Sequence, residues 1–549
     1  MPVSVITTEQ SAGAESASGL REWQRRALAQ MQSWSEGSFL ISAAPGAGKT
    51  RPALEFARRE LQRRAVEGVV VVCPTAPLTR QWARAAHQLG LQLLPDADSP
   101  RPPSGFHGVV VTYARISNSP RQWAAGMRER TLVVADEAHH LGEELAWGES
   151  FAAAFSRASR WLLLSGTPFR SDAAAIPGVE YDANGLAEPH VSYTYADAVR
   201  DGVCRPVAFV TYDGTLSWRS GEDVIESTFD AVLSSREASR RYRTAISTEL
   251  PDGLPRILGE AHARLQSLRN GAHPDAGGLV IAADSEHARK VAAQLRSVVG
   301  QAPVVVLHQD PKAAQKLAAF THSGEAWMVA VNMVSEGVDI PRLRVGVYAT
   351  AAKTPLIFRQ IVGRFVRTNG GRRPEPSWLY IPADTILRDH AANVETELRY
   401  MVRQGSQEDF GELDEVERAK SEQGEVLDFE PLSADVAPQM SLFGPAFSDP
   451  VPAVTRWPAS IPGPVVPLPA SAESDAQAEA ELPAFERRAQ LRAKRHRLVA
   501  DLSRDLRSSH REVNAQVNRT LGIDSVDKAT IEELERSIEW LDKRLYGSR

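Results

Sequence analysis

The sequence predicts an α/β protein with two parallel-sheet lobes, a helical connector between them, a disordered linker rich in Pro and Ala, and a small helical C-terminal domain. Three observations lead to this prediction. Short apolar runs alternate with helical segments in two separate series, apolar patterning then fades, and helical periodicity returns near the end. With 549 residues the chain is also too long for one hydrophobic core, which agrees with several domains.

The first series of apolar runs defines a first lobe at residues 20–206, after a small, polar segment, residues 1–19, that we expect to be disordered. Continuous apolar runs indicate buried strands of a parallel sheet. The runs are Phe39–Ile41, Val69–Val72, Val109–Val111, Leu132–Val134 and Trp161–Leu164. Each ends in a turn or a polar cluster, where an open α/β sheet places its ligand sites.

The second series defines a second lobe at residues 277–421. Its runs are Leu279–Ile281, Val304–Leu307, Met328–Val331, Val345–Tyr348 and Trp378–Ile381. The intervening residues 207–276 look mostly helical, so we expect them to form a connector between the lobes.

The C-terminal part changes character twice. Residues 422–482 are rich in Pro, Ala, Ser and Asp, and their sparse apolar patterning predicts a disordered linker. Residues 483–549 regain helical periodicity, which predicts a helical tail domain. Thr530 and Glu533 are spaced as a capping box at the start of its last helix. The apolar stripe of that helix consists of Ile531, Leu534, Ile538, Leu541 and Leu545.

The composition excludes several classes of protein. Two cysteines, Cys73 and Cys204, are too few for a disulfide framework or a cysteine-rich metal site, and they fit a reducing compartment. The sequence shows neither a signal peptide nor a membrane-spanning run, so we expect a cytoplasmic protein without membrane partners. The net charge of −6 does not indicate nucleic-acid binding by the whole chain, so any such binding needs a local basic surface.

The segment Ala43–Thr50 predicts a phosphate-binding loop. It lies between a strand and a helix and matches the Walker A pattern, with Ala43 in place of the first glycine. Gly46, Ala47 and Gly48 let backbone N–H groups curl around phosphate oxygens. Lys49 would reach the outer phosphates, and the Thr50 hydroxyl would bind Mg²⁺.

The segment Asp136–His139 supplies a second half for this site. Its acids follow the strand Leu132–Val134, where a Walker B strand delivers its carboxylates. We assign Asp136 to the metal ion and Glu137 to the attacking water. Alone, such a cluster is as readily a solvated acidic loop, but downstream of a phosphate-binding loop the functional interpretation is favoured.

Three later motifs complete the pattern, at Ser165–Arg170, Ser335–Pro341 and Gln360–Arg367. In this order the motifs resemble those of superfamily two helicases of the DEAH type, and are most similar to the branch of restriction-enzyme motor subunits and DNA repair translocases. The resemblance covers about two-thirds of the chain. It implies two RecA-like lobes that bind ATP with Mg²⁺ and hydrolyse the ATP.

The resemblance also implies roles for individual residues. Gln24 would recognise adenine, Gly337 and Asp339 would contact the nucleotide, and Ser165, Gly166 and Thr167 would couple nucleotide state to nucleic-acid contact. The nucleic-acid contacts would be Pro74, Thr75, Arg80, Gln81, Thr112, Tyr113 and Ser335. Trp82 could equally be a core residue. The Thr-rich form of the motif around Ser335, common in the family, is absent here.

The last motif predicts arginine fingers. Arg364 and Arg367 lie at i and i+3, on one face of a helix, and a planar guanidinium offers paired donors to the γ-phosphate. Gln360 of the same motif is the third catalytic candidate in this lobe.

The expected function is therefore an ATP-dependent DNA helicase or translocase, in repair, restriction or phage defence. One alternative is a nucleotide-switched DNA-binding or recruitment subunit, and another is an RNA helicase. A basic run in the tail motivates the recruitment alternative, because it could bind DNA or an acidic protein partner, although a solvated helix face explains it equally well. The run consists of Arg487, Arg488, Arg492, Lys494, Arg495 and Arg497.

Overall fold

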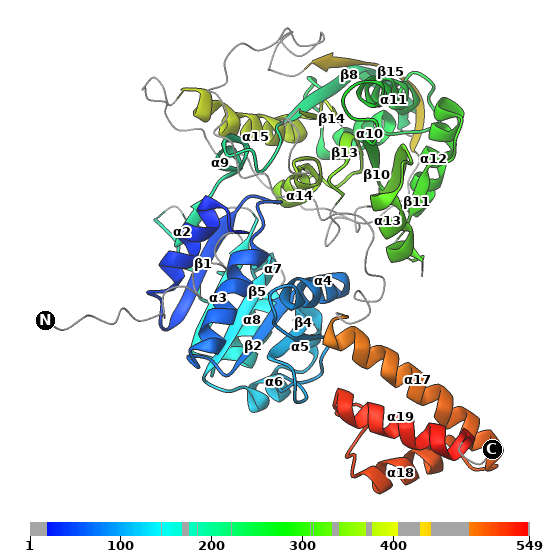
Figure 1. Ribbon diagram of the computed structural model, residues 1–549. Coiled ribbons are helices and arrows are strands. Elements are labelled where there is room, and N and C mark those ends of the chain that lie inside the picture. The colour runs from blue at the N-terminus through cyan, green and yellow to red at the C-terminus, as the bar shows by residue number, and fades with distance from the viewer. Residues whose placement is uncertain are drawn as a thin grey trace, which may run out of the picture. The chain divides into compact units, whose positions relative to one another are not determined.

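The computed structural model describes residues 19–143, 145–166, 175–183, 185–220, 222–307, 309–310, 312–331, 340–368, 376–403, 429–440 and 482–546. By their contacts these residues form two compact units. The first contains residues 19–42, 48–192 and 482–546, and the second contains residues 43–47 and 193–440. Figure 1 shows the chain coloured from the N-terminus to the C-terminus.

The first sheet has seven strands in the order β3-β4-β2-β5-β6-β1-β7. Its strands are β1 (Gly37–Ala43), β2 (Gly68–Cys73), β3 (Leu93–Pro95), β4 (Gly108–Thr112), β5 (Thr131–Asp136), β6 (Arg160–Ser165) and β7 (Val191–Tyr193). From β3 to β1 all neighbours pair in parallel. Every apolar run predicted for this lobe lies in one of these strands. The parallel arrangement brings the ends of β1, β2, β4, β5 and β6 to one edge of the sheet, where the predicted site residues follow.

Helices cover the first sheet. They are α2 (Glu22–Met31), α3 (Thr50–Gln62), α4 (Ala76–His87), α5 (Tyr113–Asn118), α6 (Pro120–Gly126), α7 (His140–Glu143) and α8 (Leu145–Phe155). Trp123, Phe151 and Phe155 pack with the valines of β4 and β5 in one hydrophobic core. Arg160 of β6 and Glu60 of α3 form a buried ion pair, in which Arg160 Nη1 lies 2.8 Å from Glu60 Oε2. Removal of one partner from such a pair leaves an uncompensated buried charge.

The second sheet has eight strands, seven of them in the order β11-β12-β10-β13-β14-β8-β15, while β9 pairs with β8. The strands are β8 (Val207–Ser220), β9 (Asp223–Ser227), β10 (Gly277–Ala282), β11 (Val304–Val306), β12 (Trp327–Val331), β13 (Leu343–Ala349), β14 (Ser377–Pro382) and β15 (Phe429–Met440). The helices are α9 (Tyr195–Arg200), α10 (Ser235–Ala245), α11 (Leu254–Asn270), α12 (Ser285–Val299), α13 (Ala313–His322), α14 (Pro355–Phe365) and α15 (Thr385–Arg403). Both predicted parallel sheets are thus confirmed.

The prediction of a helical connector at residues 207–276 is wrong in its first half. That half forms β8, a strand of 14 residues that pairs with β14 in parallel and with β9 and β15 in antiparallel fashion. Polar residues interrupt its apolar positions, and only Leu216 and Trp218 of its outer half are deeply buried apolar residues. This weak signal explains the error. The second half, α10 and α11, is helical as predicted.

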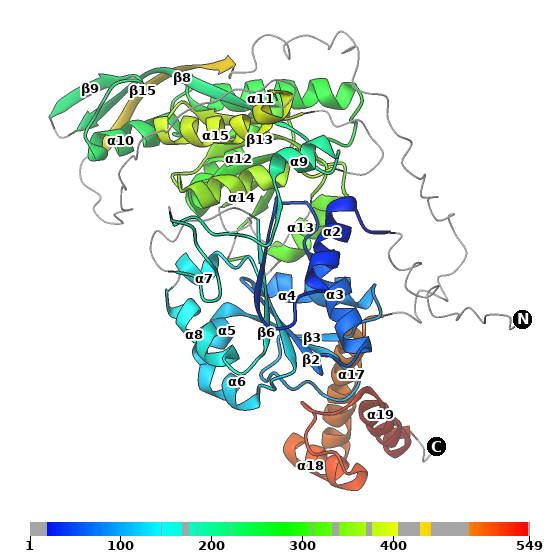
Figure 2. The same cartoon turned by 90° about the vertical axis from the view of Figure 1, so that its left-hand side faces the viewer.

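The prediction that residues 422–482 are disordered throughout is also wrong. Residues 429–440 form β15, which lies along β8 (Figure 2). Alternate side chains, Ala434 and Val436, are buried, whereas Asp435 between them is exposed. With only two buried residues among prolines and acids, the composition of this segment does not predict a strand. Pairing with β8 stabilises the strand further.

The tail forms three helices, α17 (Ala484–Asp505), α18 (His510–Leu521) and α19 (Ile531–Tyr546), which share a hydrophobic core. The predicted capping box is confirmed, since Glu533 N–H donates to Thr530 Oγ1 at 3.2 Å and Thr530 N–H donates to Glu533 Oε2 at 2.9 Å. No helix within the described ranges is long and apolar enough to cross a membrane.

The basic run of α17 divides into two buried arginines and four residues that are exposed or partly exposed. Arg495 is buried and donates to Ser537 Oγ, Asn514 Oδ1 and Asn518 Oδ1, at 3.1, 2.6 and 2.8 Å. Arg488 is also buried and donates to the carbonyls of Ala529 and Asp527. Three more members of the run form ion pairs, namely Arg487 with Glu535, Arg492 with Asp527, and Lys494 with Asp542. The run therefore holds the three helices together.

Candidate nucleotide-binding site

Two glycines shape the loop between β1 and α3. Gly46 and Gly48 have φ values of +79° and +87°, a left-handed conformation that favours glycine. A Cβ atom on Gly48 would also lie 3.0 Å from Gln24 Nε2, so the loop and α2 approach each other closely. Ala47, between the two glycines, is buried. The predicted phosphate-binding loop thus has the backbone geometry that the motif requires.

Gln24, the predicted adenine-recognition residue, lies against this loop. Its Nε2 donates to the carbonyl of Gly48 at 2.9 Å, and its Oε1 accepts from the N–H of Arg21 at 2.9 Å. The side chain is buried on α2. Its amide is thereby held beside the phosphate-binding loop, although recognition of adenine remains a prediction.

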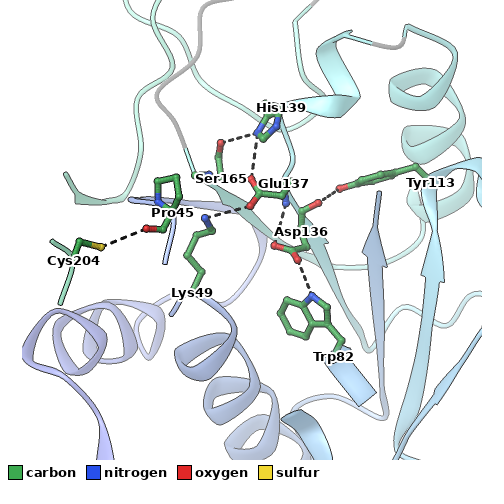
Figure 3. Close-up of polar contacts among 10 residues, drawn as sticks. Pro45, Lys49, Trp82, Tyr113, Asp136, Glu137, His139, Ser165 and Cys204 are labelled. Carbon is green, nitrogen blue, oxygen red and sulfur yellow. Dashed lines mark hydrogen bonds and ion pairs between the residues drawn. The ribbon is translucent and has the colours of Figure 1, made fainter. Parts of the chain in front are cut away.

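Lys49 and Glu137 face each other across the site (Figure 3). Lys49 caps α3, and its Nζ lies 3.4 Å from Glu137 Oε1. The other carboxylate oxygen of Glu137 accepts the N–H of Gly166 at 3.2 Å. The backbone of Glu137 has a φ of +51°, an uncommon conformation for a residue with a side chain, and such conformations cluster at functional sites.

The surroundings of Glu137 hold its carboxylate ionised. Burial alone would raise its pKa, but Lys49, His139, His140 and the N–H of Gly166 together lower the pKa to about 2. The residue that follows β5 is therefore an anion with fixed orientation, available to accept hydrogen bonds from a water molecule.

Asp136 ends β5 and is fixed by two aromatic residues. Trp82 Nε1 donates to its Oδ2 at 2.7 Å, and the Tyr113 hydroxyl donates to its backbone carbonyl at 2.8 Å. Burial and the neighbouring Glu137 carboxylate raise the pKa of Asp136 to about 6. The buried carboxylate of Asp136 and the partly buried carboxylate of Glu137 thus form an acidic pair beside Lys49.

This donor set fits Mg²⁺ in kind. The cation prefers carboxylate and hydroxyl oxygens together with phosphate oxygens. Asp136 and Thr50, the first residue of α3, would hold it. No group of three or more metal-ligating side chains occurs among the residues placed by the structure.

Ser165, the last residue of β6, and His139, in the turn after β5, also belong to the site. The Nδ1 atom of His139 lies 3.2 Å from Ser165 Oγ and 3.5 Å from Glu137 Oε2. Ser165 and Gly166, two of the predicted coupling residues, therefore both reach the Glu137 carboxylate, one through His139 and one directly. The sequence alone did not predict a role for His139 or for Trp82. The DEAH pattern itself was the signal that could have identified His139.

The predicted nucleic-acid contacts of the first unit divide into two groups. Arg80 and Gln81 are exposed on α4, and Thr75 caps that helix without using its hydroxyl, which has no hydrogen-bond partner in the described structure. Thr112 caps α5 and accepts the N–H of Arg115. Pro74, in contrast, is buried.

The prediction that Tyr113 contacts nucleic acid needs correction. Its side chain is fully buried and its hydroxyl is already bonded to Asp136, so it supports the acid and has no surface to offer to a strand. The short motif gave no indication of which of its two residues faced inward.

The predicted arginine fingers belong to the second unit. Gln360 and Arg364 lie on α14, and Arg367 follows that helix and pairs with Cys204 in an isolated β-bridge. Within the same unit, a Cβ atom on Gly46 would lie 3.1 Å from Arg367 Cγ. Thr167, Ser335, Gly337 and Asp339 lie outside the described residues.

Comparison with known families identifies the first part of the chain. Residues 18–170 match the family model described as type III restriction enzyme, res subunit. This part of the chain is similar to the res-subunit domain. The match confirms the predicted resemblance to superfamily two helicases and restriction-enzyme motors, and it contains the Lys49, Asp136 and Glu137 site.

Mycobacterial proteins are similar over a longer part of the chain. An uncharacterized protein of Mycobacterium tuberculosis is 43% identical over 393 residues, which are 70% of this chain and 64% of the relative. This chain therefore covers less than two-thirds of that relative. Among solved structures, the ATP-dependent type ISP restriction-modification enzyme LlaBIII bound to DNA is similar with 16% identity and a TM-score of 0.47, over 69% of this chain and 30% of that one. The S. cerevisiae protein Dbp5 bound to RNA and ADP BeF3 has 14% identity and a TM-score of 0.45, over 69% of this chain and 87% of that one.

Proposed function

We propose that the protein is an ATP-dependent DNA translocase or helicase, in which the part similar to the res-subunit domain binds ATP with Mg²⁺ and hydrolyses the ATP. The observation that carries the proposal is the Lys49–Glu137 pair, in which the lysine of the phosphate-binding loop meets an ionised acid held by Gly166. A chance Gly-rich turn would not place these groups together.

The roles of the residues follow from this geometry. Lys49 exchanges its contact with Glu137 for the outer phosphates of ATP, and Glu137 then orients the attacking water and accepts its proton. Mg²⁺, held by Thr50 and Asp136, would supply positive charge to the phosphate oxygens. Arg364 and Arg367 donate to the γ-phosphate as charge develops, with Gln360 beside them.

Movement along DNA requires that the nucleotide state change strand contact. Ser165 and His139 connect Glu137 to the strand end of β6, next to the predicted coupling residues. Thr75, Arg80, Gln81 and Thr112 would contact the strand backbone. Because such contacts are to phosphates, affinity should fall with salt and vary little with sequence.

The deciding experiment is steady-state ATP hydrolysis by the full chain alone and with single-stranded DNA, duplex DNA or RNA at one salt concentration. Stimulation by DNA supports the DNA motor. Stimulation by RNA alone would reassign the protein to RNA remodelling, and no stimulation by any strand would favour a nucleotide-switched recruitment subunit. Two arginines of the tail basic run, Arg488 and Arg495, are bonded within the tail and do not support that last alternative.

A further inference from the structure

We propose that Trp82 is a positioning residue that couples the strand-contact helix α4 to the Asp136 carboxylate. This inference rests on the proposed function. It goes beyond that function by naming the physical link through which nucleic acid acts on the cation site.

The link begins at the start of α4. Thr75 caps this helix, and Arg80 and Gln81 are exposed on it, whereas the next residue, Trp82, is 1% exposed and points inward. Its Nε1 donates to Asp136 Oδ2 at 2.7 Å (Figure 3). The same helix therefore presents strand-contact residues outward and a hydrogen-bond donor to the acid inward.

The Asp136 carboxylate has few other constraints. Its Oδ1 accepts only the N–H of the adjacent Glu137, at 3.1 Å, among the bonds described. Because a carboxylate turns readily about its last torsion angle, the Trp82 N–H is the contact from outside the β5 turn that fixes its plane. Donors of this kind orient metal-binding side chains and tune their affinity.

A second link of the same kind comes from α5. Thr112 caps that helix, and the following Tyr113 donates its hydroxyl to the backbone carbonyl of Asp136 at 2.8 Å. Both predicted strand-contact segments of the first unit thus end on this one acid. A displacement of either helix by a bound strand is transmitted to Asp136.

A tryptophan that serves only in packing would not need the hydrogen bond that Trp82 donates to Asp136. A second tryptophan of the same unit shows this. Trp123 on α6 is 0% exposed, and its Nε1 has no hydrogen-bond partner among the described residues. Trp82→Phe and Trp123→Phe remove the same atoms from equally buried sites. Only the first substitution removes a donor to Asp136.

The test compares nucleotide affinity with and without Mg²⁺. We would measure the dissociation constant of a fluorescent ADP by anisotropy for the full-length protein and both variants, with and without single-stranded DNA. For Trp82→Phe we expect the Mg²⁺-dependent gain in affinity to fall by about tenfold, and the effect of DNA on that gain to disappear. Trp123→Phe should retain both.

The outcomes separate the two proposals. Equal Mg²⁺ dependence in the two variants would overturn the role of Trp82, while a full-length protein without Mg²⁺-dependent nucleotide binding would overturn the proposed function itself. If Trp82→Phe melts far below Trp123→Phe, Tyr113→Phe decides, because it removes a single oxygen from the second link. If DNA has a smaller effect on the Mg²⁺-dependent gain in ADP affinity of Tyr113→Phe, the coupling is supported. If the effect of DNA is unchanged, the coupling is overturned.

Discussion

Lys49 Nζ lies 3.4 Å from Glu137 Oε1, so the cation of the phosphate-binding loop and the acid after β5 form an ion pair within the first unit. Each partner compensates the charge of the other in a largely buried setting. Substitution of either one therefore changes the chemistry of both.

Lys49→Ala should abolish ATP hydrolysis, with a loss of at least about a hundredfold, because the site loses the charge directed at the phosphates. Initial rates at saturating ATP would measure the loss. Lys290→Ala is the matched control, since Lys290 pairs with Glu249 and Glu286 at the surface of α12. Turnover by Lys49→Ala equal to that of the control would exclude the proposed phosphate role.

Glu137→Gln should keep nucleotide binding and lower hydrolysis by about 10²- to 10⁴-fold, because the amide still accepts the N–H of Gly166 but cannot take a proton from water. Single-turnover hydrolysis and nucleotide binding, measured together, would show bound but unreacted ATP. Glu149→Gln, on the exposed face of α8, is the control. Normal turnover by Glu137→Gln would mean that another group activates the water.

Ser165→Ala should lower the stimulation by nucleic acid more than the basal rate, because the hydroxyl contacts His139, which in turn contacts Glu137. The measurement is the ratio of stimulated to basal hydrolysis. Ser156→Ala, at an exposed position, should leave that ratio as it is. A parallel fall of both rates in Ser165→Ala would assign the serine to hydrolysis itself.

Removal of residues after 440 should leave the second unit intact, whereas removal of residues after 428 should destabilise it. Only the shorter chain lacks β15, whose Val436 is fully buried against β8 and contributes about 2 kcal/mol by burial alone. Thermal unfolding of the two truncated chains would show the difference. Both lack the tail and its Arg84–Glu486 ion pair, so that loss cancels in the comparison. Identical melting would show that β15 adds nothing to the second unit.

Arg495→Ala should destabilise the tail by about 2–4 kcal/mol, because Ser537, Asn514 and Asn518 lose a buried common donor. Arg497→Ala, on the exposed face of α17, should be nearly neutral. Chemical denaturation monitored at α17–α19 would separate the two variants. DNA affinity should change little in either variant. A large loss of DNA affinity in a folded Arg495→Ala variant would indicate that the tail binds nucleic acid.

The sequence was sufficient to predict the two parallel sheets and the acidic half of the site. Continuous valine runs such as Val69–Val72 are buried on both faces, and this produces an unambiguous pattern. Lys49, Asp136 and Glu137 follow strands whose carboxyl ends meet at one edge, so their proximity follows from topology alone.

The remaining features depend on contacts distant in sequence. Trp82 stayed open between a motif residue and a core residue, because only the fold shows that its N–H donates to Asp136, 54 positions later. The sequence left the basic run of α17 open between a binding surface and a solvated face, and it did not predict the burial of Arg488 and Arg495, because their acceptors lie on α18, α19 and the segment before α19. A charge pattern along one helix does not show whether another helix already satisfies it.

The pairing of β8 with β15 also has a consequence during biosynthesis. Leu216 pairs with Ala434, more than two hundred positions further along the chain. At about 5–20 residues per second, a ribosome needs roughly 10 to 40 s to make the intervening segment. During that interval the edge of β8 that β15 occupies is unpaired, so the nascent second unit exposes backbone hydrogen-bonding groups until translation passes residue 440.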